Sequence, residues 1–145
     1  MKVRDILKIK GRPVVTIGPN ETIYTAMRRL VENNIGALLV CDAKGMLLGI
    51  VSERDVLRES SQHIGAINNT QVKDVMTRDI AIGIPDDELD YVISIMTQKG
   101  IRHLPIMAGP KLQGIISMRD IVETQLEESK AQVRFLSDYI SGGYT

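Results

Sequence analysis

Cysteine and aromatic residues are scarce in this chain of 145 residues. It has one cysteine, no tryptophan, one phenylalanine and four tyrosines. The lone cysteine, Cys41, excludes a disulfide bond within the chain and fits a reducing compartment, so we expect a cytoplasmic protein. The shortage of aromatic side chains argues against a base-stacking platform for single-stranded nucleic acid.

The chain also lacks an excess of one charge and a long apolar segment. The 18 basic and 18 acidic side chains give a formal net charge of +0, which argues against a nucleic-acid partner, because such partners select a basic face. No apolar run approaches the roughly 20 residues that cross a bilayer, and the opening MKVRDILKIK has no signal-peptide core. We therefore expect neither a nucleic acid nor a membrane as partner.

What the sequence does contain is an internal repeat. GIVSERD at 49–55 returns as GIISMRD at 114–120, an offset of 65 (114 − 49). Upstream, residues 26–40 align with 92–106 at an offset of 66 (92 − 26), so the second connecting turn is expected to be one residue shorter. The match continues to about residue 122, and a repeat of this length indicates two copies of one structural unit.

Each copy has the same predicted order of elements, β-α-β-β-α. An extended stretch at 13–19 or 79–85 ends at a proline, which disfavours helix at the residue before it. A helix follows, with Asn20 expected as N-cap in the first copy and Asp86 or Asp87 in the second. Two apolar strands around a turn come next, and then a second helix that begins after a serine of the repeated motif.

These elements predict an α/β (α+β) fold of two small units. We place unit 1 at 1–59, a polar linker at 60–70, unit 2 at 71–124 and a tail at 125–145. One such unit buries too little to fold alone, so the two should pack through their sheets with pseudo-two-fold symmetry. The tail should extend the last helix, because it carries apolar residues at helical spacing, namely Leu126, Val133, Leu136 and Ile140. Such a stripe can pack on its own core or on a second copy.

The doubled element order, with GIVSERD and GIISMRD at matching places, resembles a CBS domain pair, also called a Bateman module. The chain is similar to stand-alone bacterial or archaeal members, which carry no enzyme or channel. The resemblance implies a homodimer and a regulatory module that binds AMP, ADP, ATP or NAD(H) and signals by conformational change. It implies no catalytic residues, and the sequence shows no nucleophile–base pair and no phosphate-cradling glycine loop.

The resemblance also gives the repeated motif a chemical role. Asp55 and Asp120 match an aspartate that holds a ribose diol, since a carboxylate accepts from both hydroxyls. Ser52 and Ser117 lie beside ribose or phosphate at a helix start, where N–H groups are free. The residues alone allow another interpretation: Ser-x-x-Asp is close to a capping box, which stabilises a helix by about 1 kcal/mol.

Two candidate sites follow from the resemblance, each drawing on both units. The first contains Ser117, Asp120, Arg102 and His103, with Val15, Ile35 and Ala37 through their backbone, and Arg54. The second contains Ser52, Asp55, Thr16, Ala81, Ile101 and Arg119. Unit 1 has no arginine matching Arg102, so we expect the Asp120 site to be the better phosphate site. Lys10 and Arg12 either meet the phosphates of a longer ligand or form a charged arm.

Other interpretations of these residues stay open. The arginines of the motif can be solvated helix cations, and Arg102 and His103 can lie at an exposed strand start. His103 is not expected to bind metal, because the only other histidine, His63, falls in the linker. The rival functions are a protein-interaction or dimerisation module with empty clefts and a small enzyme acting on a nucleotide. A third rival, S-adenosylmethionine or DNA as the ligand, is disfavoured by the neutral charge and the few aromatic residues.

Overall fold

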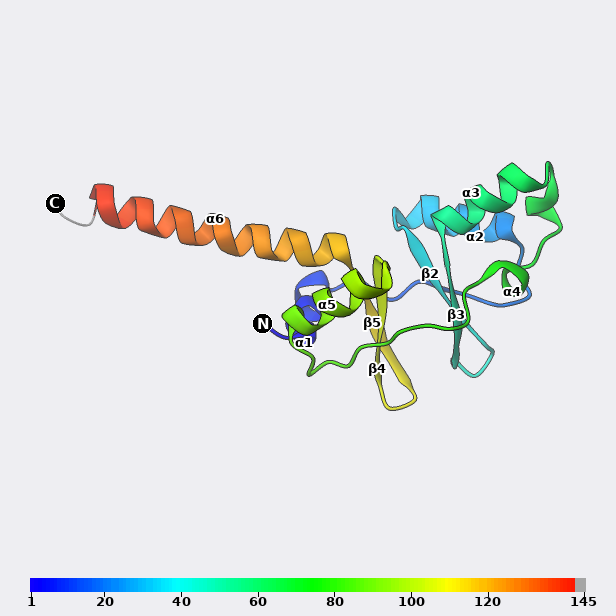
Figure 1. Ribbon diagram of the computed structural model, residues 1–145, viewed down its shortest axis with the longest axis horizontal. Coiled ribbons are helices and arrows are strands. Elements are labelled where there is room, and N and C mark those ends of the chain that lie inside the picture. The colour runs from blue at the N-terminus through cyan, green and yellow to red at the C-terminus, as the bar shows by residue number, and fades with distance from the viewer. Residues whose placement is uncertain (143–145) are drawn as a thin grey trace.

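The computed structural model describes residues 1–142 and consists of two similar halves, with one long helix leaving the body (Figure 1). The first half contains β1 (Thr16–Ile17), α2 (Ile23–Asn33), β2 (Ala37–Cys41), β3 (Leu47–Ser52) and α3 (Glu53–Gln62). The second contains α5 (Leu89–Lys99), β4 (His103–Ala108), β5 (Lys111–Ser117) and α6 (Met118–Gly142). Short helices precede the halves: α1 (Val3–Lys10), η1 (Ala66–Asn68) and α4 (Val72–Val75). The predicted α+β class with a C-terminal helix is confirmed.

The sheets differ in one strand. In the first half β1 pairs with β2 in parallel and β2 pairs with β3 antiparallel, whereas the second half has only the antiparallel pair β4–β5. The strand expected at 79–85 is reduced to one parallel bridge between Gly83 and Ile106. The physical reason is Pro105, which has no N–H to donate to Ala81 and so cannot extend this ladder.

The second hairpin is one residue shorter than the first, as the repeat predicts. Cys41 pairs with Leu47 across the first turn, six residues apart (47 − 41), while Met107 pairs with Leu112, five residues apart (112 − 107). Both hairpins contain an irregularity directly before these pairs. The two copies therefore share even their departures from regular pairing.

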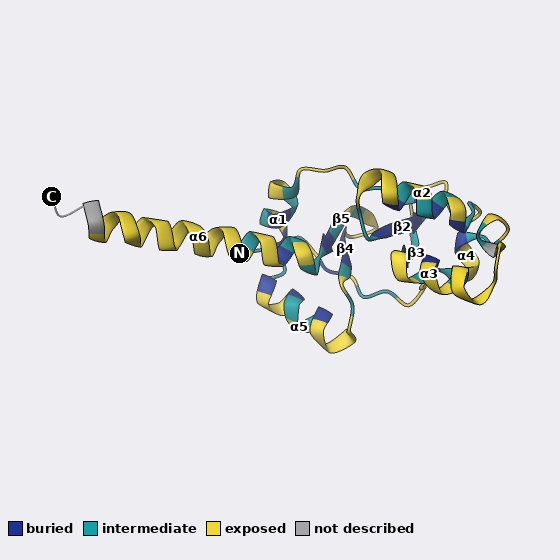
Figure 2. Cartoon of the chain, turned by 90° about the horizontal axis from the view of Figure 1, so that it is seen from above, coloured by how far each residue is buried: buried dark blue, intermediate teal, exposed yellow. Residues whose placement is uncertain are grey.

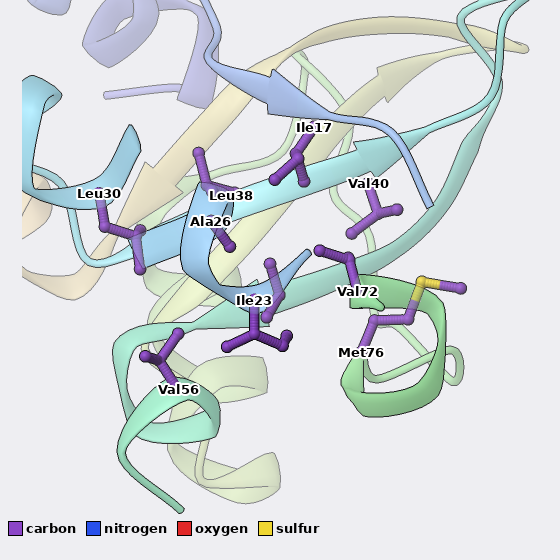
Figure 3. Close-up of a cluster of buried hydrophobic side chains, with 10 residues drawn as sticks. Ile17, Ile23, Ala26, Leu30, Leu38, Val40, Val56, Val72 and Met76 are labelled. Carbon is purple, nitrogen blue, oxygen red and sulfur yellow. The ribbon is translucent and has the colours of Figure 1, made fainter. Parts of the chain in front are cut away.

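The two hydrophobic cores exchange their short first helices. The first core, shown in Figure 3, is built from β1, α2, β2, β3 and α3, and Val72 and Met76 at α4 complete it. The second core is built from α5, β4, β5 and α6, and Val3 and Ile6 of α1 complete it. Thus the segment that opens the chain packs on the second half, and the two halves interlock.

Strand β2 is buried on both faces, so another part of the chain covers the face that points away from the first core. Leu38 and Val40 belong to the first core, while Ala37 and Leu39 point to the opposite face. These two are only 4% and 0% exposed, so that face is also covered. On β4, Met107 is buried outside the second core in the same way. Figure 2 shows buried residues on the strands and on one face of helices such as α2 and α5, with the exposed helix faces around them.

The N-caps of the first helices differ from the prediction. Helix α2 begins after Thr22, whose hydroxyl accepts a hydrogen bond from Thr25 N at 3.2 Å, so the choice of Asn20 was wrong. Asn20 instead lies in the turn that follows Pro19. The cap of α5 is Glu88 rather than either preceding aspartate, because Asp87 accepts from Ile84 N within the turn, at 2.9 Å. The predicted caps of the second helices, Ser52 and Ser117, are confirmed.

The glycines of the repeated motif lie where another segment approaches closely. A Cβ on Gly49 would lie 2.7 Å from the backbone oxygen of Thr77 and 2.8 Å from Met76 Sδ. A Cβ on Gly114 would lie 2.8 Å from Leu7 Cδ2, the end of a flexible side chain on α1. The glycine thus lets each half accept the exchanged segment.

We expect Gly49→Ala to lower the free energy of unfolding by roughly 1–3 kcal/mol, the usual cost of overpacking. Gly114→Ala should cost less, because a leucine end moves more easily than a backbone carbonyl. Urea denaturation of the two variants and the wild type measures both effects. Equal losses, or a larger loss for Gly114→Ala, would contradict this account of the motif.

Helix α6 extends away from the body beyond its first turns (Figure 1). Seven apolar side chains on it are more than half exposed. Five of them follow one another at spacings of 4, 7, 3 and 4, namely Val122, Leu126, Val133, Leu136 and Ile140, and the other two are Phe135 and Tyr139. No described helix has both the length and the apolar content needed to cross a membrane. Cys41 is free and half-buried, and burial raises the pKa of its thiol.

Candidate functional site

A cavity of about 770 Å³ lies between the two halves, beside the end of α1. This volume is within the range of small-molecule sites, about 300–1,000 Å³. Val15, Ile35 and Ala37 of the first half line it, and His103 and Asp120 of the second half line it from the other side. The structure therefore brings together in one cavity five residues that the sequence assigned to one site.

Asp120 is held at the edge of this cavity by its own helix start. Its Oδ2 accepts a hydrogen bond from Ser117 N at 2.8 Å, and its N–H donates to Ser117 Oγ at 3.0 Å, which is the capping arrangement. The ammonium of Lys10 also donates to Asp120 Oδ2, at 2.9 Å, and to the carbonyl of Ile115, at 2.9 Å. The two hydrogen bonds that the Asp120 carboxylate accepts from described residues both end on Oδ2, so Oδ1 can still accept from a ligand.

The Lys10–Asp120 pair is mostly shielded from water. The side chains are 23% and 20% exposed, respectively. Burial is the largest influence on Asp120 and raises the pKa of its carboxyl, but the Ser117 N–H and the Lys10 ammonium together outweigh it and leave the pKa below its ordinary value. Asp120 is therefore a carboxylate at neutral pH, and it is a hydrogen-bond acceptor.

His103 faces the same cavity from the start of β4 and packs against the first half. A Cβ on Gly36 would lie 3.3 Å from His103 Nε2 and 3.6 Å from Glu53 Oε1, so a side chain at 36 would push the ring away. Burial, and next the Lys10 ammonium, lower the pKa of His103, while Asp120 and Glu53 oppose them. The ring is accordingly neutral near pH 7 and can both donate and accept.

Further charges line the cavity toward solvent. Lys10 and Arg12 both line the cavity. The sequence allowed two interpretations of this pair, as contacts to a ligand phosphate or as a charged N-terminal arm. Arg119, which the sequence placed at the other site, also lines the cavity, and its Nε donates to Glu123 Oε1 at 2.9 Å. The carboxylates of α6 that reach the rim are Glu123, Glu127 and Glu128.

Three residues predicted for the Asp120 site do not line the cavity. Ser117 does not reach the cavity itself but positions Asp120 through the two capping hydrogen bonds. Arg102 is exposed, and its carbonyl accepts from Met118 N at 2.8 Å. Arg54 is exposed on the first turn of α3. The cations that do reach the cavity come from α1, the segment after it, and α6.

The Asp55 motif repeats the capping arrangement of Asp120, but among the described residues no lysine donates to Asp55 as Lys10 does to Asp120. Asp55 Oδ2 accepts from Ser52 N at 2.8 Å and from Ser52 Oγ at 3.0 Å, and Arg58 lies 3.8 Å from Oδ1. Ala81 and Ile101, predicted beside Asp55, pack on the second core.

A second depression, of about 790 Å³, is lined by Thr16 and Cys41 of the first half and Leu112 of the second. Thr16 was predicted beside Asp55, but neither of these two cavities includes Ser52 or Asp55. No group of three or more metal-ligating side chains comes together within the described residues.

Sequence reasoning missed Gly36, Ile115 and Thr124 at the Asp120 cavity. Ile115 contributes its carbonyl, which any residue can supply, so the sequence carries no signal for it. Thr124 donates from its hydroxyl to the Asp120 carbonyl at 2.8 Å. Gly36 could have been found, because the repeat aligns it with Arg102 and so marks a position where the copies differ.

The comparisons with known proteins agree with this architecture. The sequence profile of the CBS domain matches residues 3–62 and 72–127, which together cover most of the chain. The chain therefore belongs to the CBS-domain family and carries two copies of the domain.

Among similar proteins, the CBS domain-containing protein YhcV of Bacillus subtilis is 34% identical over 119 residues, covering 81% of this chain and 83% of its own. The crystal structure of a CBS-domain containing protein from Agrobacterium tumefaciens is 36% identical with a TM-score of 0.82, covering 86% of this chain and 99% of its own. The CBS domain pair of protein MJ0100, solved in complex with 5′-methylthioadenosine and S-adenosyl-L-methionine, is 27% identical with a TM-score of 0.76, covering 90% and 98%.

Proposed function

We propose that this chain is a non-catalytic sensor that binds an adenosine-containing nucleotide in the Asp120 cavity and signals through the arrangement of its two halves. The observation that carries the proposal is the cavity itself. It lies between the halves and contains a shielded carboxylate whose Oδ1 can still accept. The candidate ligands are AMP, ADP, ATP and NAD(H), which share the adenosine group.

The lining fits the three parts of such a ligand. Asp120 is assigned to the ribose hydroxyls, because a carboxylate accepts from both as charge-assisted bonds. Val15 and Ile35 line the cavity and offer apolar surface for the base. Arg12 and Arg119 are cations for the phosphate. The ligands in the MJ0100 complex also contain adenosine, which supports this class of ligand for the chain.

Signalling follows from the position of the cavity. Because its walls come from both halves, a bound ligand favours the arrangement in which both walls contact it. Binding with a micromolar Kd corresponds to about 8 kcal/mol, of which only the difference between two arrangements can shift their populations. The exchanged helix α1 connects the cavity to the second core, so this helix is the element through which the shift is expected to spread.

The proposal includes a homodimer formed through α6. Five of the exposed apolar residues of that helix, Val122, Leu126, Val133, Leu136 and Ile140, follow a heptad pattern, in which Ser129 occupies the one polar position. Such an apolar seam packs against another helix with the same pattern. Within the described residues this chain supplies one such seam, and it extends from the body with its apolar side chains in solvent. A second copy therefore provides the complementary surface.

Calorimetric titration with AMP tests the proposed binding function. We expect saturable binding by the folded protein and no AMP consumption, as judged by product analysis of the recovered ligand. A protein-interaction module with empty clefts predicts no saturable heat. An enzyme predicts turnover of the nucleotide. Either of these results would contradict the proposal.

A further inference from the structure

The two repeats satisfy one backbone carbonyl in different ways. In the first half the carbonyl of Ile50 accepts from the backbone N–H of Thr77, at 2.9 Å. The matching carbonyl, that of Ile115 (115 − 50 = 65), accepts instead from the side chain of Lys10, at 2.9 Å. The same ammonium reaches Asp120, so it stands between the carbonyl and the carboxylate.

The structure fixes the position of Lys10. It is the last residue of α1, and the chain turns directly after it at Gly11, which has a φ of 55° and whose N–H donates to the carbonyl of Leu7 at 3.1 Å. Val3 and Ile6 anchor the helix in the second core. Lys10 is therefore a built part of the cavity and not the end of a free arm.

A ligand whose two ribose hydroxyls both bond the Asp120 carboxylate must compete with this ammonium for Oδ2, although one hydroxyl can reach Oδ1 with Lys10 in place. Lys10 bonds Oδ2 and covers one side of the carboxylate that the ribose hydroxyls would approach. Leaving a mostly buried charge without a partner is costly, whereas passing it to another anion is not. The rim carboxylates Glu123, Glu127 and Glu128 are exposed and screened by water, and Glu123 already accepts from Arg119, so they replace Asp120 poorly.

We propose that Lys10 occupies the ribose position at Asp120 in the unliganded protein and thereby makes this cavity select ligands that carry a phosphate. Only such a ligand offers the displaced ammonium a new anionic partner inside the cavity. A neutral nucleoside would displace the Lys10 ammonium without offering it an anionic partner. The Asp55 motif has no matching lysine, so this selection belongs to the second half. The inference rests on the proposed nucleotide binding and adds the identity of the residue that sets charge selectivity.

His103 makes a test specific to this cavity possible. The chain has two histidines, and the other, His63, lies at the end of α3 with its side chain 64% exposed. Titrations with AMP and with adenosine, followed through the His103 ring resonances by NMR, give a Kd for each ligand at this cavity alone. The proteins compared are the wild type, Lys10→Met, Lys10→Arg, and Lys8→Met as the matched control, since Lys8 does not line the cavity.

We expect Lys10→Met to bind adenosine at least about threefold more tightly than the wild type and to lower the preference for AMP over adenosine at least about tenfold. Lys10→Arg and Lys8→Met should keep the wild-type preference. Without ligand, Lys10→Met should raise the pKa of His103, because the ammonium that lowers it is gone. If Lys10→Met keeps the wild-type preference for AMP over adenosine, the proposed role of Lys10 is overturned while the proposed nucleotide binding stands. Absence of binding by the wild type overturns the proposed function and this inference together.

Discussion

Replacing Asp120 by alanine is expected to weaken AMP binding at least tenfold. The carboxylate is the group assigned to both ribose hydroxyls, and hydrogen bonds to a charged group contribute about 1.5–3 kcal/mol each. Losing two bonds of about 1.5 kcal/mol would weaken binding more than a hundredfold. Calorimetric titration of the folded variant with AMP measures the change.

The variant also removes a helix cap, so a control must separate binding from folding. Asp120→Asn retains an oxygen that can accept from Ser117 N, and it should fold like the wild type while still binding AMP poorly. Asp87→Ala removes the same kind of bond, from Ile84 N at 2.9 Å, at a place that does not line the cavity, and should bind AMP normally. Wild-type affinity in both Asp120 variants would contradict the ribose assignment.

Replacing Leu136 by glutamate is expected to dissociate the proposed dimer. Leu136 lies within the apolar seam of α6, and a dimer would bury the substituted side chain twice, once from each copy. An unpaired carboxylate at such a place loses at least about 1.4 kcal/mol per copy, so the dimer Kd should rise at least about a hundredfold. Sedimentation equilibrium over a range of protein concentrations measures this Kd.

Ala131→Glu is the matched control for this prediction. Ala131 is on the same exposed helix, about 200° around it from Val133, so it faces away from the seam. It should leave the dimer unchanged. A wild type that is monomeric at the concentrations of the titrations, or equal dissociation by both variants, would contradict a dimer through this seam.

The sequence predicted the repeated architecture well because the signals are local and appear twice. The serine caps before α3 and α6 and the shorter second turn follow from spacing alone. The cap of α2 could not be chosen, because Asn20 and Thr22 both suit an N-cap and only the fold of the preceding turn decides between them. The missing strand near Gly83 depends on a partner strand with a proline, which is a tertiary effect.

The candidate site was predictable in part, for a similar reason. The motif indicated Asp120, and the difference between the copies indicated His103, both of which line the cavity. The sequence could not show that the cores exchange α1 and α4, since apolar residues such as Val3 suit either core. That exchange brings Lys10 to Asp120 across more than 100 positions of the chain, a contact that no local pattern encodes.

A crystal structure of the protein with AMP tests the central claim most directly. We expect both ribose hydroxyls to lie about 2.6–3.0 Å from the oxygens of Asp120, with the Lys10 ammonium moved from that carboxylate to the phosphate. AMP bound elsewhere, or a cavity without AMP in which Lys10 still bonds Asp120, would contradict it.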